Sequence, residues 1–303
     1  MKYRSNLERV LSEGKFALTA EVGPPKGSDP NKILKKAEIL KGYVDAFNIT
    51  DNQTAVVRMS SIAGCSLLLR MDMEPIMQMT CRDRNRIALQ SDVLGAAAMG
   101  IKNILCLTGD HQSFGNHPNA KGVYDVDSIQ LIQILKNMRD KGIFQSGDEI
   151  IAGKPDIFIG AAANPYAEPY ELRVDRLEKK IVAGADFIQT QSVFNLDRFN
   201  EWMDDVRSRG LDKKIHILAG ITPLKSLRMT ERMKFHVPGV DVPDTIYNRM
   251  KKTTDHKKEG YEIALDLIKE LKNIKGVHGI HITALFWEDI IPSLIVKTDL
   301  YPR

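Results

Sequence analysis

The chain repeats one pattern, in which an amphipathic segment of helical period ends at a glycine and a short apolar run follows. A glycine directly after a helix can adopt the left-handed backbone conformation that ends the helix without a steric penalty. Short runs of aliphatic and β-branched residues are typical of strands that are buried on both faces of a parallel sheet. The pattern occurs five times and predicts strands over Val44–Thr50, Lys102–Thr108, Asp186–Gln191, Ile215–Ala219 and Ile280–Thr283.

Three more apolar runs fit the same rhythm and predict strands over Phe16–Val22, Pro75–Thr80 and Asp156–Ala162. The intervals are amphipathic and predict helices, the first of which follows the start signal Ser28-Asp29-Pro30. Helices are predicted, for example, over Asn31–Lys41, Arg84–Met99, Ser128–Lys141, Tyr170–Ala183 and Leu196–Arg209. Eight strands that alternate with helices indicate the α/β class and a closed (β/α)8 TIM barrel, with residues 1–303 forming a single domain.

An open doubly wound sheet is the alternative architecture. That fold favours a GxGxxG turn after the first strand, whereas the turn here is Gly23-Pro24-Pro25-Lys26-Gly27. Two wider intervals, 111–127 and 236–256, contain Gly, Pro, Asn and His. In a barrel they predict long loops or an inserted element near the active site.

The composition argues against several classes of protein. Hydrophobic residues make up 43% of the 303 positions, which provides for a large core and argues against disorder. The net charge of +4 is small and evenly spread, which argues against nucleic-acid binding. No apolar run approaches the roughly 18 residues of a membrane span, and no signal-peptide pattern precedes the first strand. Three scattered cysteines, Cys65, Cys81 and Cys106, favour a reducing compartment, so we expect a cytoplasmic location.

Polar residues at the C-terminal ends of barrel strands face the active site. Glu21 and Asp110 are the two carboxylates in this position. The others carry amides or hydroxyls: Thr50, Gln78, Thr80, Asn164, Gln191, Thr222 and Thr283. This set has no nucleophile paired with a base, no strand-end lysine and no cluster of metal ligands, so no metal site is predicted. It suits a reaction in which a bound cofactor carries out the difficult chemistry, and it argues against a barrel lyase or aldolase.

Three of these positions have competing interpretations. Glu21 ends a strongly apolar strand, which favours a functional acid over a solvated loop carboxylate, because partial burial would raise its pKa. Asp110 is either a turn residue bonded to its own backbone or a ligand-binding residue beside Gly109, whose small size permits close approach. Of Gln189 and Gln191, we expect one to point inward and the other to bond only the backbone.

The motifs together resemble one family, methylenetetrahydrofolate reductase, a flavin-containing (β/α)8 enzyme. The resemblance covers essentially the whole chain in order. Each motif is weak by itself, whereas the ordered set is specific. The matching segments are Thr19–Pro25, Asn48–Thr50, Met79–Cys81, Leu107–Asp110, Gly115–Lys121, Val123–Ser128, Arg176–Gln191 and Ala219–Pro223.

The resemblance implies reduction of 5,10-methylenetetrahydrofolate to 5-methyltetrahydrofolate. Glu21 matches the general acid that protonates N10 and opens the five-membered ring to an iminium ion, to which flavin N5 delivers hydride. Asp110 matches the carboxylate that lies beside flavin and pterin and stabilises the cation, and Gln191 matches the glutamine that holds the substrate. The matching flavin-contacting positions are Thr50, Gly109, Asp110, Tyr124, Ala162 and Lys180. Arg176 is a further candidate, although Arg176, Lys179 and Lys180 by themselves indicate only a solvated helix face.

Several cofactor positions depart from the family pattern. Gln78 stands where many members have a flavin-binding His, and Thr108 stands where many have Arg. Asn164 replaces an aromatic residue, and Glu168 falls near another His position. Several of these positions serve the far end of FAD, so FMN stays open as an alternative to FAD, the family default.

The expected partners are a folate substrate and an electron donor. Leu227, at a substrate-binding position, replaces the aromatic residue that NADH-dependent bacterial members place over nicotinamide and folate, and Phe286-Trp287 replace Asn-Arg. The electron donor is therefore left open between NAD(P)H and an iron–sulfur partner subunit. A cluster would have to belong to such a partner, because three scattered cysteines cannot supply one. A homo-oligomer or a hetero-complex is expected. The alternative function is a flavin- and folate-binding barrel subunit that is active only within a larger complex.

Overall fold

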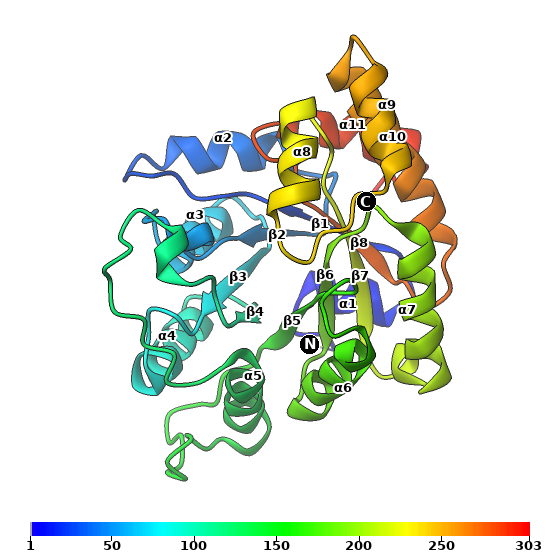
Figure 1. The fold of residues 1–303 in the computed structure, drawn as a ribbon. Helices are drawn as coiled ribbons and strands as arrows, with labels where there is room; N and C mark the ends of the chain where they lie inside the picture. The colour runs from blue at the N-terminus through cyan, green and yellow to red at the C-terminus, as the bar shows by residue number, and fades with distance from the viewer. Residues whose placement is uncertain (1) are drawn as a thin grey trace.

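The computed structural model describes residues 2–303 and contains a closed barrel of eight parallel strands (Figure 1). The strands are β1 (Ala17–Glu21), β2 (Ala46–Ile49), β3 (Pro75–Thr80), β4 (Asn103–Leu107), β5 (Phe158–Ala163), β6 (Phe187–Ser192), β7 (His216–Ile221) and β8 (Gly279–Ile282). They pair in sequence order, and β8 pairs with β1, so the predicted TIM barrel is confirmed and the open sheet is excluded. Each predicted apolar run overlaps one observed strand.

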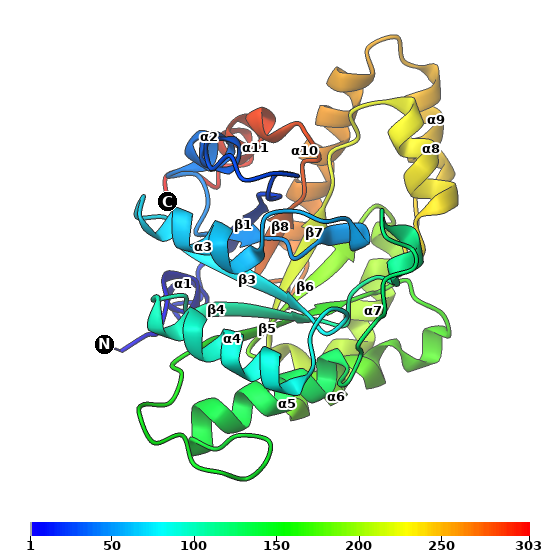
Figure 2. The same cartoon turned by 90° about the vertical axis from the view of Figure 1, so that its left-hand side faces the viewer.

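Helices follow the strands and surround the barrel (Figures 1 and 2). They are α2 (Asn31–Leu40), α3 (Ser61–Leu69), α4 (Arg86–Ala98), α5 (Ser128–Lys136), α6 (Arg173–Ala183), α7 (Leu196–Ser208), α8 (Leu227–His236), α9 (Asp244–Lys252), α10 (His256–Asn273) and α11 (Ile291–Lys297). A further helix, α1 (Asn6–Ser12), precedes β1. No helix within residues 2–303 is long and apolar enough to cross a bilayer.

The glycines that the sequence pattern places after helices end those helices as expected. All five have a positive φ: Gly42 (81°), Gly100 (90°), Gly184 (116°), Gly210 (64°) and Gly276 (89°). At Gly184 the requirement is also steric, because a Cβ atom would lie 2.5 Å from Cδ of Lys136. The helix–glycine–strand pattern of the sequence therefore corresponds to the observed alternation of helices and strands.

The two wide intervals differ in structure. Residues 111–127 form a long loop between β4 and α5, with one short 3-10 turn at Gln112–Phe114. The interval 236–256 is an inserted element, since α9 follows α8 there and the two helices stand together at the edge of the barrel in both views (Figures 1 and 2).

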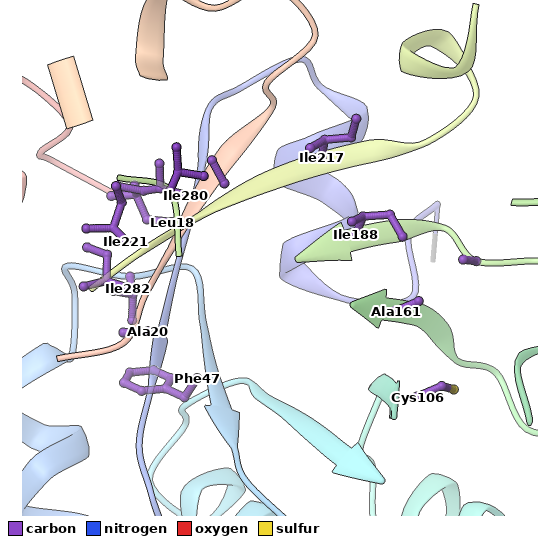
Figure 3. Packing of buried hydrophobic residues seen from close by; sticks show 14 of the residues in the cluster. Leu18, Ala20, Phe47, Cys106, Ala161, Ile188, Ile217, Ile221, Ile280 and Ile282 are labelled. Atoms are coloured by element: carbon purple, nitrogen blue, oxygen red, sulfur yellow. The ribbon is translucent and has the colours of Figure 1, made fainter. Parts of the chain in front are cut away.

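The core has two parts, one outside and one inside the strands. Outward-facing residues such as Leu18, Ala20 and Ile188 pack under the helices, and Figure 3 shows several of them. Inside, the half of the barrel where the strands begin is filled by large apolar side chains such as Phe158 and Phe187, whose rings stack at 5.1 Å. Helix α1 covers this end with Leu7, Val10 and Leu11. An internal cavity can therefore open only where the strands end.

Candidate active site

A cavity of about 330 Å³ opens at the C-terminal ends of the strands. Inward-facing side chains from opposite sides of the barrel form its wall. They include Glu21 of β1, Gln78 of β3, Ala162 of β5, Gln191 of β6, and His281 and Thr283 at the end of β8. The cavity therefore gathers carboxyl, amide and hydroxyl groups where TIM-barrel enzymes carry their catalytic residues.

Glu21 is the titratable group best suited to proton transfer here. It is the last residue of β1. Burial, with a smaller contribution from the negative charge of Glu288, raises the pKa of Glu21 to about 7 against the opposing charges of Arg58 and Lys36. A carboxyl group with this pKa keeps its proton on a substantial fraction of molecules at neutral pH and can donate it.

A buried network of neutral polar groups crosses the barrel one step below Glu21. The amides of Asn48 and Gln189 bond to each other, with Nδ2–Oε1 and Nε2–Oδ1 distances of 2.6 and 3.0 Å. Gln189 Nε2 also donates to Thr19 Oγ1 at 3.2 Å, and this hydroxyl lies 3.0 Å from His281 Nδ1. Burial lowers the pKa of His281 to about 4, so the ring is neutral at pH 7. The network gives the cavity a rigid floor without a net charge.

Sequence reasoning missed Thr19, Asn48 and His281 in this floor. The available signal was the strand period, because each lies two residues before a strand-end position already considered: Glu21, Thr50 and Thr283. The expectation that only one of Gln189 and Gln191 points inward is wrong for the same reason. Both line the cavity, since residues two apart on a strand share a face. Gln191 does bond the backbone, accepting from the amide of Ser192 at 3.0 Å.

A second cavity of about 280 Å³ adjoins the first and shares Ala163, Asn164 and Lys180 with it. Thr108 and Arg176 also line it, together with Ser128 at the start of α5. Burial lowers the pKa of Lys180, and the charge of Arg176 lowers it further. The Lys180 ammonium donates to the carbonyl of Ala162 and forms no salt bridge with any described residue. Unpaired cations beside a helix N-terminus suit a phosphate-bearing cofactor.

The remaining predicted residues line neither cavity. They belong to the segments that follow the C-terminal ends of the strands, which we call the rim. Asp110 is exposed, and its Oδ2 accepts from the Thr54 amide at 3.2 Å. The Tyr124 hydroxyl donates to the Asp110 carbonyl at 3.1 Å, which ties the two ends of the loop between β4 and α5 together. Gly109 has φ 92°, and a Cβ there would lie 3.1 Å from Cβ of Thr80.

Two further rim residues were singled out from the sequence. Thr50 is buried and donates to Gln53 Oε1 at 2.5 Å. Leu227, the first residue of α8, packs against the outer core and does not line either cavity. The structure thus divides the predicted site residues between the two cavities and the rim.

The segment after β8 supplies a second carboxylate, Glu288, whose charge acts on Glu21. Phe286 is 74% exposed and has φ 55°, while Trp287 is buried. Lys36 Nζ lies 5.2 Å from the Phe286 ring centre and 2.6 Å from Glu288 Oε1. The two members of this pair act on the pKa of Glu21 in opposite directions, Glu288 raising it and Lys36 lowering it.

The comparison with known families decides which barrel this is. A family model described as "Methylenetetrahydrofolate reductase" matches residues 6–299. The chain belongs to the methylenetetrahydrofolate reductase family. The resemblance seen in the sequence motifs is therefore confirmed at the level of the family.

Relatives within the methylenetetrahydrofolate reductase family differ in length. The "Probable methylenetetrahydrofolate reductase (NADPH)" of Caenorhabditis elegans is 24% identical over 97% of this chain, which spans only 44% of that protein. The "5,10-methylenetetrahydrofolate reductase" of Pectobacterium carotovorum is 25% identical over 93% of this chain and 90% of its own length. The chain thus spans less than half of the eukaryotic relative and most of the bacterial one.

Among solved structures, a protein from Clostridium thermocellum superimposes with a TM-score of 0.64 at 15% identity, over 98% of this chain and 99% of its own. Its description is an uncharacterized protein that binds two copies of 5-methyl-5,6,7,8-tetrahydrofolic acid. At this identity the likeness concerns the fold.

Proposed function

We propose that this chain reduces 5,10-methylenetetrahydrofolate to 5-methyltetrahydrofolate with a bound flavin as the hydride donor. The observation that carries the proposal is Glu21, a cavity carboxyl whose pKa is raised to about 7, in a chain of the methylenetetrahydrofolate reductase family. The bacterial relative bears the name of this reaction, and the Clostridium thermocellum protein is described as binding the methylated folate.

The first step is proton transfer from Glu21 to N10 of the substrate. The bond between N10 and the methylene carbon then breaks, and the positive charge remains on the iminium formed by N5 and that carbon. Glu21 becomes a carboxylate and takes up a proton from solvent before the next turnover. Partial burial supports this role, because it holds the proton on Glu21 until a basic nitrogen is presented.

The substrate is oriented by neutral groups and its cation is stabilised by a carboxylate. We assign the pterin contact to the Gln191 amide, which lies in the cavity wall with Glu21. We assign the stabilisation of the cation to Asp110, whose carboxylate is held by the Thr54 amide at the rim. Leu227 is retained as a substrate-side candidate at the start of α8.

We assign the flavin to the two adjoining cavities. Lys180 and Arg176 would hold a phosphate near the N-terminus of α5, and the half-buried ammonium of Lys180, which has no salt-bridge partner among residues 2–303, supports this assignment. The other proposed contacts are Thr50, Gln78, Thr108, Gly109, Asp110, Tyr124, Ala162 and Asn164. When bound, a reduced flavin supplies the hydride that converts the iminium carbon into a methyl group. FAD and FMN both remain candidates.

The electron donor is NAD(P)H or an iron–sulfur partner subunit. Within residues 2–303 the three cysteines are buried, and burial raises the pKa of Cys81 to about 12, so they are inert packing residues. A cluster would therefore come from a partner. An aliphatic side chain at Leu227, packed against the core, favours this second arrangement, in which the barrel works within a hetero-complex.

Rapid mixing of reduced, flavin-loaded protein with 5,10-methylenetetrahydrofolate tests the proposal. The flavin should be reoxidised, and Glu21→Gln should slow that step by about 10²–10⁴-fold while leaving flavin content unchanged. Glu38→Gln, on the exposed side of α2, is the matched control. Protein that cannot be loaded with FAD or FMN, or a Glu21→Gln variant with an unaltered rate, would contradict the mechanism.

A further inference from the structure

The hydrogen bonds of the cavity floor form a chain that ends at Thr283, and the partners of each group fix its direction. Gln189 Nε2 donates its two hydrogens to Asn48 Oδ1 and Thr19 Oγ1, at 3.0 and 3.2 Å. The Thr19 oxygen is therefore an acceptor, and among residues 2–303 the hydrogen of its own hydroxyl has one side-chain acceptor, His281 Nδ1 at 3.0 Å. Since the ring of His281 is neutral, its single proton then lies on Nε2.

This proton sets the orientation of the Thr283 hydroxyl. His281 Nε2 lies 3.3 Å from Thr283 Oγ1, so the ring donates and the hydroxyl oxygen accepts. The hydrogen of Thr283 itself bonds no other described residue, and Thr283 lines the cavity. The floor of the barrel therefore makes Thr283 a hydrogen-bond donor toward the cavity.

Thr283 stands beside Glu21 on the neighbouring strand. Strands β1 and β8 pair in a register that joins Ala20 to Ile282, so the next positions along the two strands are Glu21 and Thr283. Ala20 and Ile282 lie close together outside the barrel in Figure 3, and the two residues that follow them line the cavity inside. Neighbouring strands are about 4.8 Å apart, so rotation of the Glu21 side chain brings a carboxyl oxygen within reach of the Thr283 hydroxyl.

The Glu21 carboxyl has need of such a donor once it ionises. Apart from burial, the influences on its pKa are the charges of Arg58, Lys36 and Glu288, and none of these is a hydrogen bond. The ammonium of Lys180, which lines the same cavity, is bonded to a backbone carbonyl of β5. A hydrogen bond to the ionised form of a buried carboxyl lowers its free energy without adding a charge to the cavity.

We propose that Thr283 is a positioning residue, which donates a hydrogen bond to the Glu21 carboxylate that forms when the proton passes to the substrate. The bond turns one carboxyl oxygen toward β8 and leaves the other, which carries the proton before transfer, facing the cavity. This role in catalysis rests on the proposed function, because it requires Glu21 to act as the acid.

Infrared titration of the Glu21 carboxyl band in the full chain tests the bond without turnover. Thr283→Val exchanges the hydroxyl for a methyl group of similar size. The midpoint of Glu21 should rise by about one pH unit relative to the intact chain, because the carboxylate loses its donor. Thr283→Ser keeps a hydroxyl and should keep the midpoint of the intact chain.

Thr222→Val is the matched control. Thr222 directly follows β7, its hydroxyl lies 2.6 Å from Ser192 Oγ, and it lines neither cavity. The variant should keep the midpoint of the intact chain, since it removes a buried hydroxyl that does not face Glu21.

The direction of the hydrogen-bond chain has a test of its own, which needs no variant of the floor to fold in order to give an answer for the intact chain. Nitrogen-15 spectra of protein labelled at histidine distinguish a neutral ring protonated at Nε2 from one protonated at Nδ1, and His281→Gln identifies the signals of His281. We expect the proton on Nε2. A proton on Nδ1 would overturn the inference, because the hydrogen of Thr283 would then turn toward the ring.

The remaining outcomes separate the inference from the proposed function. An unchanged midpoint in Thr283→Val, a raised midpoint in Thr283→Ser, or an equal rise in Thr222→Val would overturn the inference alone. If the spectra show the expected effects but the reduced, flavin-loaded chain is not reoxidised by 5,10-methylenetetrahydrofolate, the proposed function is contradicted, and the catalytic role of Thr283 with it.

Discussion

The interior of the barrel changes character along each strand, and the contrast between its two ends explains the site. On β6 the inward residues run Phe187, Gln189, Gln191, and on β1 they run Ala17, Thr19, Glu21. The first layer is apolar and filled, the second is neutral and hydrogen-bonded across the barrel, and the third faces the cavity. Residues two positions apart on the same strand therefore have different roles: the first two layers stabilise the fold, and the third faces the site of the proposed reaction.

The closed end should be the most sensitive to truncation. Phe187→Ala removes a fully buried ring that stacks on Phe158, and we expect a loss of about 3–5 kcal/mol of unfolding free energy. Urea denaturation measures it. Phe286→Ala, which removes a ring that is 74% exposed, should change stability by less than about 0.5 kcal/mol. Similar losses for the two variants would mean that the buried closed end of the barrel does not contribute more to stability than an exposed residue does.

The middle layer should respond to loss of hydrogen-bond partners and not to volume. Gln189→Leu keeps a side chain of similar size but leaves the Asn48 amide unpaired in the interior, which should cost about 2–3 kcal/mol. The double variant Asn48→Leu/Gln189→Leu should cost less than the sum of the single changes in a denaturation cycle. Strict additivity would show that the network is not a unit.

At the open end, replacing the polar residue should increase the free energy of unfolding and not decrease it. The pKa of Glu21 is raised from 4.5 to about 7, so the folded state binds more protons than the unfolded chain between these values. Stability therefore falls as pH rises from 4.5 to 7 and stays reduced above 7. Glu21→Gln removes this penalty and should stabilise the protein at pH 8, by on the order of 1–2 kcal/mol, with no gain below pH 4.5. A variant that is less stable at pH 8 would show that Glu21 is not held at a cost.

The sequence predicted the fold and the open end better than the layers beneath it. The strand runs and their preceding glycines specify the barrel, and strand ends point to Glu21, Gln78 and Gln191 without any structure. Thr19 and Asn48 were not assigned to the site, although each lies two residues before a strand-end position and therefore shares its face of the strand.

Long-range electrostatics could not be predicted from the chain. The charges of Glu288 and Lys36 meet Glu21 only because β8 closes on β1. The sequence also does not reveal that Lys26, Arg58 and Arg70, which are far apart along the chain, line one groove beside α3. Which charged side chains lie close together becomes evident only from the positions of the loops in the structure.

The central claim is that the open end of the barrel holds Glu21 as an acid that is still protonated near neutral pH. Infrared difference spectroscopy measures this directly, as the protonated-carboxyl band that is present in the intact chain and missing in Glu21→Gln. We predict that this band titrates with a midpoint near pH 7. A midpoint near 4.5, the ordinary value for a glutamate, would contradict the account.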